Sequence, residues 1–189
     1  MHPDSINYSR ATTDDELTQI LSIQQRNIKS SLSSGDFSKE GFVTVEHELE
    51  VLRRMNYACA HIIAKHESKV VGYALAMQPS FARDIPVLRP LIQLTDQMLT
   101  GVDYLIMGQI CIDKPYRKLG IFSGMYRFYR KQLHLQYPCL VTEVATENQR
   151  SLQAHLHLGF ENLHTRIENG TQWELLVWYW NADERKTTS

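Results

Sequence analysis

Cysteine is scarce in this sequence and is not arranged for cross-linking or metal binding. Cys59, Cys111 and Cys139 each lie singly within an apolar run, without Cys-x-x-Cys spacing. This pattern argues against a disulfide framework and against a structural zinc site. We expect three buried free thiols in a reducing cytoplasm, and no bound metal.

Long apolar runs and an excess of charge are also missing. No stretch approaches the ~18 apolar residues of a membrane span, and the first residues show no apolar signal segment. The formal net charge is −1, without a basic-aromatic stripe, so neither nucleic acid nor a membrane is an expected partner. The 43% hydrophobic and 22% charged residues that are present are typical of a soluble globular protein. We expect one domain over residues 1–189, with an ordered core at about 6–180.

Apolar periodicity alternates along the chain between helical and strand spacing. Thr13-Asp14-Asp15-Glu16 has capping-box form, and Asn169-Gly170 between two strand patterns is a strong hairpin signal. The expected elements, in chain order, are a strand at 6–10, a helix after the capping box, a loop at 29–39, a helix capped by Thr44 with Val45, Leu49, Leu52 and Met55 on its apolar face, strands at 58–65 and 69–77, a short helix at 90–99, a strand at 104–112, a helix at 122–136, a strand at 138–145, a helix at 148–158, and strands at 160–167 and 171–180. This order predicts an α/β fold with a mixed, strongly twisted sheet of about six to seven strands flanked by helices.

The turn that follows the strand at 104–112 combines features of a phosphate site. Gly120 can adopt a positive φ, and it precedes a helix whose first turn has unpaired N–H donors. Arg117 and Lys118 add positive charge, which favours a pyrophosphate. The patterns GxxxxGK[ST] and GxGxxG are absent, which argues against a P-loop or a dinucleotide fold. On local chemistry alone, a phosphate site and a purely structural turn are both open.

Two stretches, at residues 109–122 and 147–160, resemble motifs of the GNAT acetyltransferase superfamily. Residues 109–122, QICIDKPYRKLGIF, are similar to its acyl-CoA signature, a strand followed by Arg/Gln-x-x-Gly-x-Gly/Ala at a helix start. Arg117 and Gly120 match this signature, and Phe122 stands where Gly or Ala is usual. Residues 147–160, ENQRSLQAHLHLGF, are similar to its later motif, Asn-x-x-(Ser/Ala) followed by a helix that ends in Leu-Gly-Phe. The two motifs occur in the family's order, and the element order fits over nearly the whole chain.

The resemblance implies an acetyl-CoA site between two splayed strands, with the pantetheine arm lying in the gap as a pseudo-strand. Main-chain contacts from Ile110 and Ile112 are implied, with Cys111 on the opposite face of the strand. The residues implied to hold the pyrophosphate are Arg117, Lys118, Leu119, Gly120, Ile121, Phe122 and Ser123. Asn148 and Ser151 are implied to contact the cofactor from the second motif. Asn148 can also be the N-cap of its helix, and both roles can hold at once.

Direct attack of a neutral amine on the thioester needs a base, an oxyanion donor and a proton for the leaving thiolate. Glu143 interrupts an apolar strand, where an unpaired carboxylate is costly, so it is either the base or part of an ion pair with Arg127 or His61. His155 stands where the family frequently has Tyr. It is either the general acid or a position-holder near the sulfur, with water protonating the thiolate.

The acceptor side is less specific. Gln109 and Asp113 are weaker choices for the base, and Tyr73 and Tyr104 either orient substrate or belong to the core. The residues expected to line the acceptor cleft are those at 29–43 and 78–102.

The function implied is that of an N-acetyltransferase, which moves an acetyl group from acetyl-CoA to a primary amine of a small molecule or amino acid. Two alternatives stay open: a noncatalytic CoA-binding sensor or scaffold of the same fold, and an enzyme that uses a different acyl-CoA donor. The aromatic closing hairpin, with Trp173, Trp178, Tyr179 and Trp180, suits a homodimer contact and simple packing equally well.

Overall fold

The computed structural model describes residues 5–28, 43, 45–83 and 85–180. The main helices and strands, in chain order, are β1 (Ile6–Arg10), α1 (Asp14–Asn27), α3 (Leu49–Ala58), β2 (Ile62–His66), β3 (Lys69–Met77), α4 (Arg89–Met98), β4 (Tyr104–Ile112), α5 (Ile121–Leu133), β5 (Cys139–Ala145), α6 (Gln149–Leu158), β6 (Glu161–Glu168) and β7 (Thr171–Tyr179). Short 3-10 turns at Pro79–Arg83, Pro86–Leu88 and Lys114–Tyr116 connect them. The α/β fold class predicted from the sequence is confirmed.

The seven strands form one sheet in the order β1-β2-β3-β4-β5-β7-β6. Neighbouring strands are antiparallel except for β4 and β5, which run parallel, so the sheet is mixed as expected. The last hairpin turns at Asn169 and Gly170, whose φ values of 50° and 77° are both left-handed. Positive φ at both central residues is what a two-residue primed turn requires, and Asn-Gly supplies it at the lowest steric cost.

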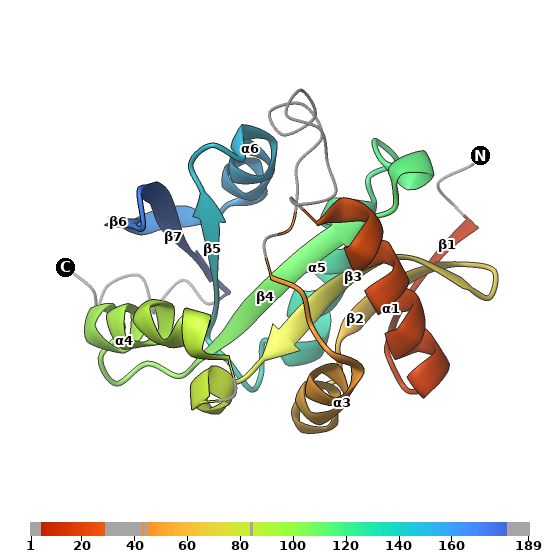
Figure 1. Cartoon of the computed structure of the whole chain (residues 1–189), viewed down its shortest axis with the longest axis horizontal. Coiled ribbons are helices and arrows are strands. Elements are labelled where there is room, and N and C mark those ends of the chain that lie inside the picture. Colours follow the sequence, from red (N-terminus) through yellow and green to blue (C-terminus); the bar gives the residue numbers. More distant parts are fainter. Residues whose placement is uncertain (1–4, 29–42, 44, 84, 181–189) are drawn as a thin grey trace.

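Helices cover both faces of the sheet (Figure 1). One face is buried by α1, α3 and α4 in a cluster that includes Ile20, Leu52 and Ile106, called here the α1 core. The other face is buried by α5 and α6 in a cluster that includes Leu105 and Met125, called the α5 core. Leu105 and Ile106 are consecutive on β4 and point into different cores because strand side chains alternate between faces.

The helix ends follow local chemistry. The Thr13 hydroxyl accepts from the backbone N–H of Glu16, and the Glu16 carboxylate accepts from the backbone N–H of Thr13, so the expected capping box forms at α1. Gly159 ends α6 with a φ of 106°, the left-handed conformation that a terminal glycine adopts most easily. Both ends were predicted from sequence.

Three expected boundaries were wrong. The second helix begins at Leu49, and Val45 lies before it; Thr44 and the expected loop at 29–39 are outside the described residues. The expected strand at 58–65 starts at Ile62, because α3 continues to Ala58 and the Asn56 side chain then accepts from the N–H of His61, which holds a connection in place. The helix expected to reach residue 136 ends at Leu133, whose carbonyl accepts from two later N–H groups in a closing turn.

Candidate active site

The parallel pair β4 and β5 is joined at one end and open at the other. Their pairing covers Tyr104–Ile106 against Cys139–Val141, and beyond it the two strands diverge, as Figure 1 shows. Across the open part, the Thr142 hydroxyl donates to the carbonyl of Met107 at 3.0 Å. The sheet therefore has the splayed strand pair expected from the sequence.

A bulge on β4 lies at the beginning of this gap. In the register with β3, Ala74 is opposite Ile110 and Ala76 is opposite Met107. Leu75 therefore faces two residues of β4, Gly108 and Gln109, which is the arrangement of a β-bulge. A bulge turns backbone N–H groups away from the regular ladder, and here it does so beside the open gap.

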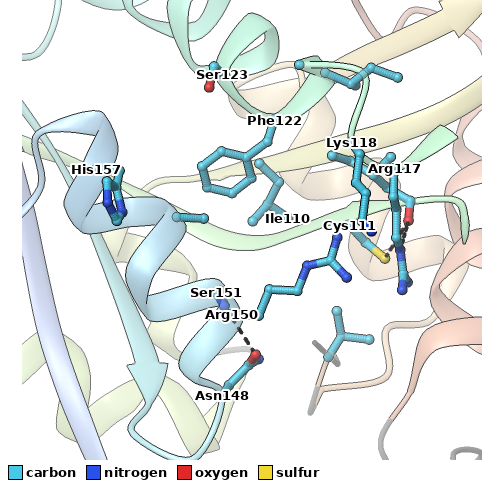
Figure 2. A pocket seen from close by; sticks show the side chains of 15 residues that line it. Ile110, Cys111, Arg117, Lys118, Phe122, Ser123, Asn148, Arg150, Ser151 and His157 are labelled. Carbon is cyan, nitrogen blue, oxygen red and sulfur yellow. Dashed lines mark hydrogen bonds between the residues drawn. The ribbon is translucent and has the colours of Figure 1, made fainter. Parts of the chain in front are cut away.

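The gap leads to a cavity of about 450 Å³, which is lined by residues of β4, of the turn after it, of α5 and of α6. Figure 2 shows Arg117 and Lys118 on one side of it, Asn148 and Ser151 on the other, and the Arg150 side chain extending from the second pair toward the first. The lining residues are Val43, Ile110, Cys111, Ile112, Arg117, Lys118, Gly120, Ile121, Phe122, Ser123, Asn148, Arg150, Ser151, Ala154 and His157. All the residues expected to hold the cofactor are among them except Leu119, whose side chain packs against the α5 core.

The backbone between β4 and α5 is shaped to point donors into this cavity. Lys118 and Gly120 have φ values of 67° and 74°, and Gly120 is the N-cap of α5. A Cβ added at Gly120 would meet no heavy atom of the described residues within 4 Å, so conformation rather than space selects glycine there. The first N–H groups of α5 have no intrahelical partner and carry the positive end of the helix dipole. This is a suitable site for a phosphate group.

The Arg117 side chain at this turn is held by two neighbouring residues. Arg117 Nε donates to the carbonyl of Ile112 at 3.1 Å, and its Nη2 donates to the Asn27 side chain at the end of α1. The guanidinium is therefore fixed at the rim of the cavity, where it ties β4, α1 and the turn together. Ile110 and Ile112 pack toward the α5 core and Cys111 packs in the α1 core, which places them on opposite faces of β4 as expected.

Helix α6 supplies the second wall. The Asn148 side chain accepts from the backbone N–H of Ser151 at 3.4 Å, so the N-cap role considered for Asn148 is confirmed. Both residues also line the cavity. Arg150 and His157 line it too, and neither was selected from the sequence. Arg150 carries a positive charge two residues after the N-cap Asn148, and this position in the second motif was the sequence signal that could have identified it.

Phe122 on α5, which stands in place of a small residue, forms an apolar part of the cavity lining. Its ring is edge-on to the rings of Tyr126 and His155, with centroid distances of 5.0 and 5.1 Å. Tyr126 in turn contacts Phe160 and Trp178. The aromatic side chain thus connects the start of α5 to α6 instead of leaving an open helix end.

A second, smaller cavity of about 70 Å³ adjoins the first through the gap. The two share Val43, Ile110, Asn148 and Ser151. The second is lined by Val43, Val45, Met107, Gly108, Gln109, Ile110, Thr142, Glu143, Val144, Ala145, Asn148, Ser151, His155 and Trp173. Both catalytic candidates, Glu143 and His155, therefore lie at the second cavity.

Glu143 is held by an ion pair that sequence reasoning did not identify. Arg166 on β6 donates from Nε and Nη2 to the two carboxylate oxygens of Glu143, at 2.7 and 2.9 Å, and from Nη1 to Glu168. Of the two roles left open for Glu143, the ion pair is present, and its partner is Arg166 instead of the suggested Arg127 or His61. Both carboxylate oxygens of Glu143 are therefore engaged by one guanidinium in a bidentate pair.

His155 is sealed between α5 and α6, with a side chain 1% exposed. Its Nδ1 lies 2.7 Å from the carbonyl of Ser151, which can only accept, so Nδ1 carries the proton. Its Nε2, 2.6 Å from the Tyr126 hydroxyl, is then the acceptor of the Tyr126 proton. Burial lowers the pKa of His155 to about 4. The ring is neutral at ordinary pH, and both of its nitrogens are engaged.

The remaining candidates for the base and for substrate orientation are bonded to other protein side chains. Tyr73 is fully buried and donates to Gln109, while the Tyr104 hydroxyl donates to Asp96 at 2.6 Å. Asp113 pairs with Arg26. Gln109 also lines the second cavity, where its side chain is held by neighbouring residues.

The three cysteines are free and buried. Among residues 5–28, 43, 45–83 and 85–180, no cluster of three or more His, Cys, Asp or Glu side chains has the arrangement of a metal site. Within the same ranges, no helix has the length and apolar character needed to cross a membrane.

The described residues thus form a split sheet with a helix start suited to a phosphate group beside the gap. No family model and no curated protein sequence matches the chain. Solved structures do match. They include Ard1 from Thermoplasma volcanium, with a TM-score of 0.65 and 10% identity over 93% of this chain and 97% of that chain.

Two further solved structures are similar to this chain to about the same degree. The ribosomal-protein-S18-alanine N-acetyltransferase from Escherichia coli has a TM-score of 0.62 and 14% identity, over 93% of this chain and 94% of that chain. NAA60 from Arabidopsis thaliana, in complex with acetyl-CoA, has a TM-score of 0.63 and 12% identity, over 92% of this chain and 99% of that chain. The chain has the fold of the GNAT acetyltransferase superfamily.

Proposed function

We propose that this protein is an N-acetyltransferase that transfers the acetyl group of acetyl-CoA to a primary amine of a small molecule or amino acid. The observation that carries the proposal is the open gap between β4 and β5, which joins a phosphate-type helix start to a second cavity. A ligand with a pyrophosphate at one end and a reactive thioester at the other fits this arrangement. The structures similar to this one include acetyltransferases crystallised with acetyl-CoA or CoA.

In this proposal the cofactor lies along β4. The turn from Arg117 to Ser123 holds the pyrophosphate, Ile110 and Ile112 contact the pantetheine arm through the main chain, and Asn148 and Ser151 contact it from α6. A backbone N–H turned out by the bulge at Gly108 and Gln109 stabilises the oxyanion of the tetrahedral intermediate. The acetyl group then faces the second cavity.

In this proposal the acceptor enters the second cavity as an ammonium ion and attacks the thioester as a neutral amine. Glu143 and the Trp173 ring, which line it, suit an ammonium group before its proton is lost. Glu143 is the proposed proton acceptor: a water molecule takes the proton from the ammonium group and passes it to the Glu143 carboxylate, which Arg166 holds in place.

His155 is proposed to stand beside the sulfur. Because its Nδ1 proton is donated to Ser151 and its Nε2 accepts from Tyr126, the contacts support the alternative in which it holds its position and water protonates the thiolate. The same occupied nitrogens, with the paired Glu143, favour one competing function, a noncatalytic CoA-binding domain. Succinyl-CoA or propionyl-CoA as donor is the other alternative, since the turn contacts the pyrophosphate and not the acyl group.

The setting and assembly are further predictions. A cytoplasmic location stays a prediction, which the three buried free thiols support. A homodimer remains the alternative use of the aromatic hairpin. Trp178 and Trp180 are 8% and 3% exposed within a single chain, which supports a packing role for them. Light scattering on the purified protein decides the oligomeric state.

The decisive experiment is calorimetric titration of CoA into the wild-type protein and into Gly120→Val. Gly120 requires a left-handed backbone, so a β-branched residue there should reorient the first N–H groups of α5 and abolish measurable binding. Gly170→Val is the matched control, because Gly170 has a φ of 77° and an equally open environment but lies at the tip of the last hairpin.

CoA binding that survives in Gly120→Val would contradict the placement of the pyrophosphate. Release of CoA from acetyl-CoA with a panel of amines then tests the reaction. Tight cofactor binding without turnover of any acceptor would favour the noncatalytic alternative, and faster turnover with a longer acyl-CoA would favour the other donor.

A further inference from the structure

Four polar side chains form a connected network inside the α1 side of the molecule. They are Gln24 on α1, His47 in the segment before α3, Tyr73 on β3 and Gln109 on the bulge of β4. Gln24 and Tyr73 are 0% exposed, Gln109 is 7% and His47 is 8% exposed. Polar groups buried to this degree are costly unless each is hydrogen-bonded, so their arrangement is informative.

The chemistry of the groups fixes the direction of every bond. Gln24 Nε2 donates to Gln109 Oε1 at 2.7 Å and to His47 Nδ1 at 2.9 Å, while Gln24 Oε1 accepts from the backbone N–H of His47 at 2.8 Å. The second acceptor bond of Gln109 Oε1 comes from the Tyr73 hydroxyl. Because an amide nitrogen can only donate, the proton of the neutral His47 ring is on Nε2.

Neither ionisable member of the network changes charge near neutral pH. Burial lowers the pKa of His47 to about 4 and raises the pKa of Tyr73 well above its ordinary value of 10. The His47 ring thus remains an acceptor and the Tyr73 hydroxyl remains a donor. The network has one hydrogen-bonding pattern, which is a requirement for holding a segment in a single position.

The segment that it holds borders the proposed acceptor cavity. Gln109 Nε2 donates to the carbonyl of Val45 at 2.8 Å, and Gln24 makes two bonds to His47. Val45 lines the second cavity, and Val43 lines both cavities. Two glutamine side chains therefore attach this wall of the acceptor cavity to α1 and to the bulge on β4.

We infer that Gln24 is a positioning residue for acceptor binding. It lines neither cavity, yet its amide holds Gln109 and His47 at the same time and so fixes the distance between the bulge and residues 45–47. The expected effect on acceptor binding rests on the proposed function. The expected effect on the position of residues 45–47 does not. Gln24 makes none of its hydrogen bonds to residues 117–123, which form the turn that holds the pyrophosphate, so we expect CoA affinity to change little when Gln24 is replaced.

The test compares Gln24→Met with Gln19→Met. Methionine has nearly the volume of glutamine and cannot make these bonds. Gln19 is the matched control, because it is also on α1 and its Oε1 accepts from the backbone N–H of Val70, away from both cavities. Three lost hydrogen bonds predict a rise in the acceptor KM of at least about tenfold in Gln24→Met. We expect a CoA Kd within about twofold of wild type in both variants.

A second pair of variants and a second measurement separate positioning from a general loss of stability. His47→Asn keeps an acceptor oxygen near the place of Nδ1 and should retain most of the acceptor affinity, whereas His47→Leu should behave like Gln24→Met. Hydrogen exchange of the His47 backbone N–H should accelerate in Gln24→Met and remain slow in Gln19→Met. The exchange experiment needs no substrate.

Unchanged His47 exchange together with an unchanged acceptor KM in Gln24→Met would overturn the inference. An equal loss of CoA binding, acceptor binding and melting temperature would also overturn it, because that pattern describes a core defect. If the wild type acetylates no amine, the proposed function fails, and the exchange of the His47 N–H still decides whether Gln24 holds the segment.

Discussion

Three histidines are enclosed in this protein in their neutral form. Burial lowers the pKa of His47 and of His155 to about 4 and that of His61 to about 3. In the unfolded chain a histidine titrates near ~6.5. Between these pKa values, the unfolded state therefore binds protons at the three histidines that the folded state does not bind. Each histidine lowers the free energy of unfolding by up to about 1.4 kcal/mol per pH unit as the pH falls through that interval.

We predict that the protein has its full histidine-linked stability above about pH 6.5 and loses it steeply toward pH 4. Urea unfolding near pH 7 and near pH 5 measures the loss. His155→Gln should be less stable than wild type near pH 7, because the bond from Tyr126 is changed. Its further loss on acidification should be smaller than that of wild type by about 2 kcal/mol. Equal losses in the two proteins would show that His155 is not buried in the neutral form.

The identity of Glu143's partner shows where sequence reasoning ends at the scale of single residues. A carboxylate inside an apolar strand needs a partner, and that much was predictable. Arg166 became the partner through the register of three strands, since it is opposite Trp173 on β7 and Trp173 is opposite Ala145 on β5. Alternation then places Arg166 on the face of Glu143. The contact between Tyr126 and His155 likewise depends on the packing of α5 against α6, which no local pattern encodes.

At the scale of elements, α1 depends on its capping box. Thr13 satisfies one of the first N–H groups of the helix, and Glu16 accepts from the backbone of Thr12 and Thr13 and from Lys65 on β2. We predict that Thr13→Ala lowers the free energy of unfolding by about 1 kcal/mol, as for other caps. Thr18→Ala is the control, because the Thr18 hydroxyl only returns to the Asp14 carbonyl within the same helix. Equal denaturation midpoints for the two variants would contradict the role of the cap.

Element boundaries were predictable where the turn residues and the apolar periodicity indicated the same end of an element. Strands β3 and β4 begin and end at the residues expected from their apolar runs and flanking polar turns. The segment before α3 was mistaken for helix because its apolar residues have helical spacing. In the structure, Val45 and His47 are bonded to glutamines of α1 and β4 instead. A tertiary hydrogen-bond network overrides local helix propensity there.

At the scale of the whole molecule, the fold consists of two half-sheets joined along a short seam. Strands β1 to β4 form one antiparallel half, and β5, β7 and β6 form the other. They meet in the three residue pairs between β4 and β5, and helices on both faces bridge them. The sequence motifs predicted that the seam would open, but the bulge at Gly108 and Gln109 and the two adjoining cavities required the structure.

This architecture leaves the open edges of β4 and β5 as a place where a ligand can complete the sheet. Backbone groups of β4 at residues 107–112 that point toward β5 are then the ones to pair with the amides of the pantetheine arm. Hydrogen exchange by mass spectrometry, with and without saturating CoA, measures this directly. We predict slower exchange in peptides that cover 107–112 and 117–123, and no change in the hairpin of β2 and β3. Gly120→Val incubated with CoA should match the free protein. Protection confined to 117–123 would mean that the pyrophosphate binds but the arm lies outside the gap, and the acyl group would then not reach the cavity beside Glu143.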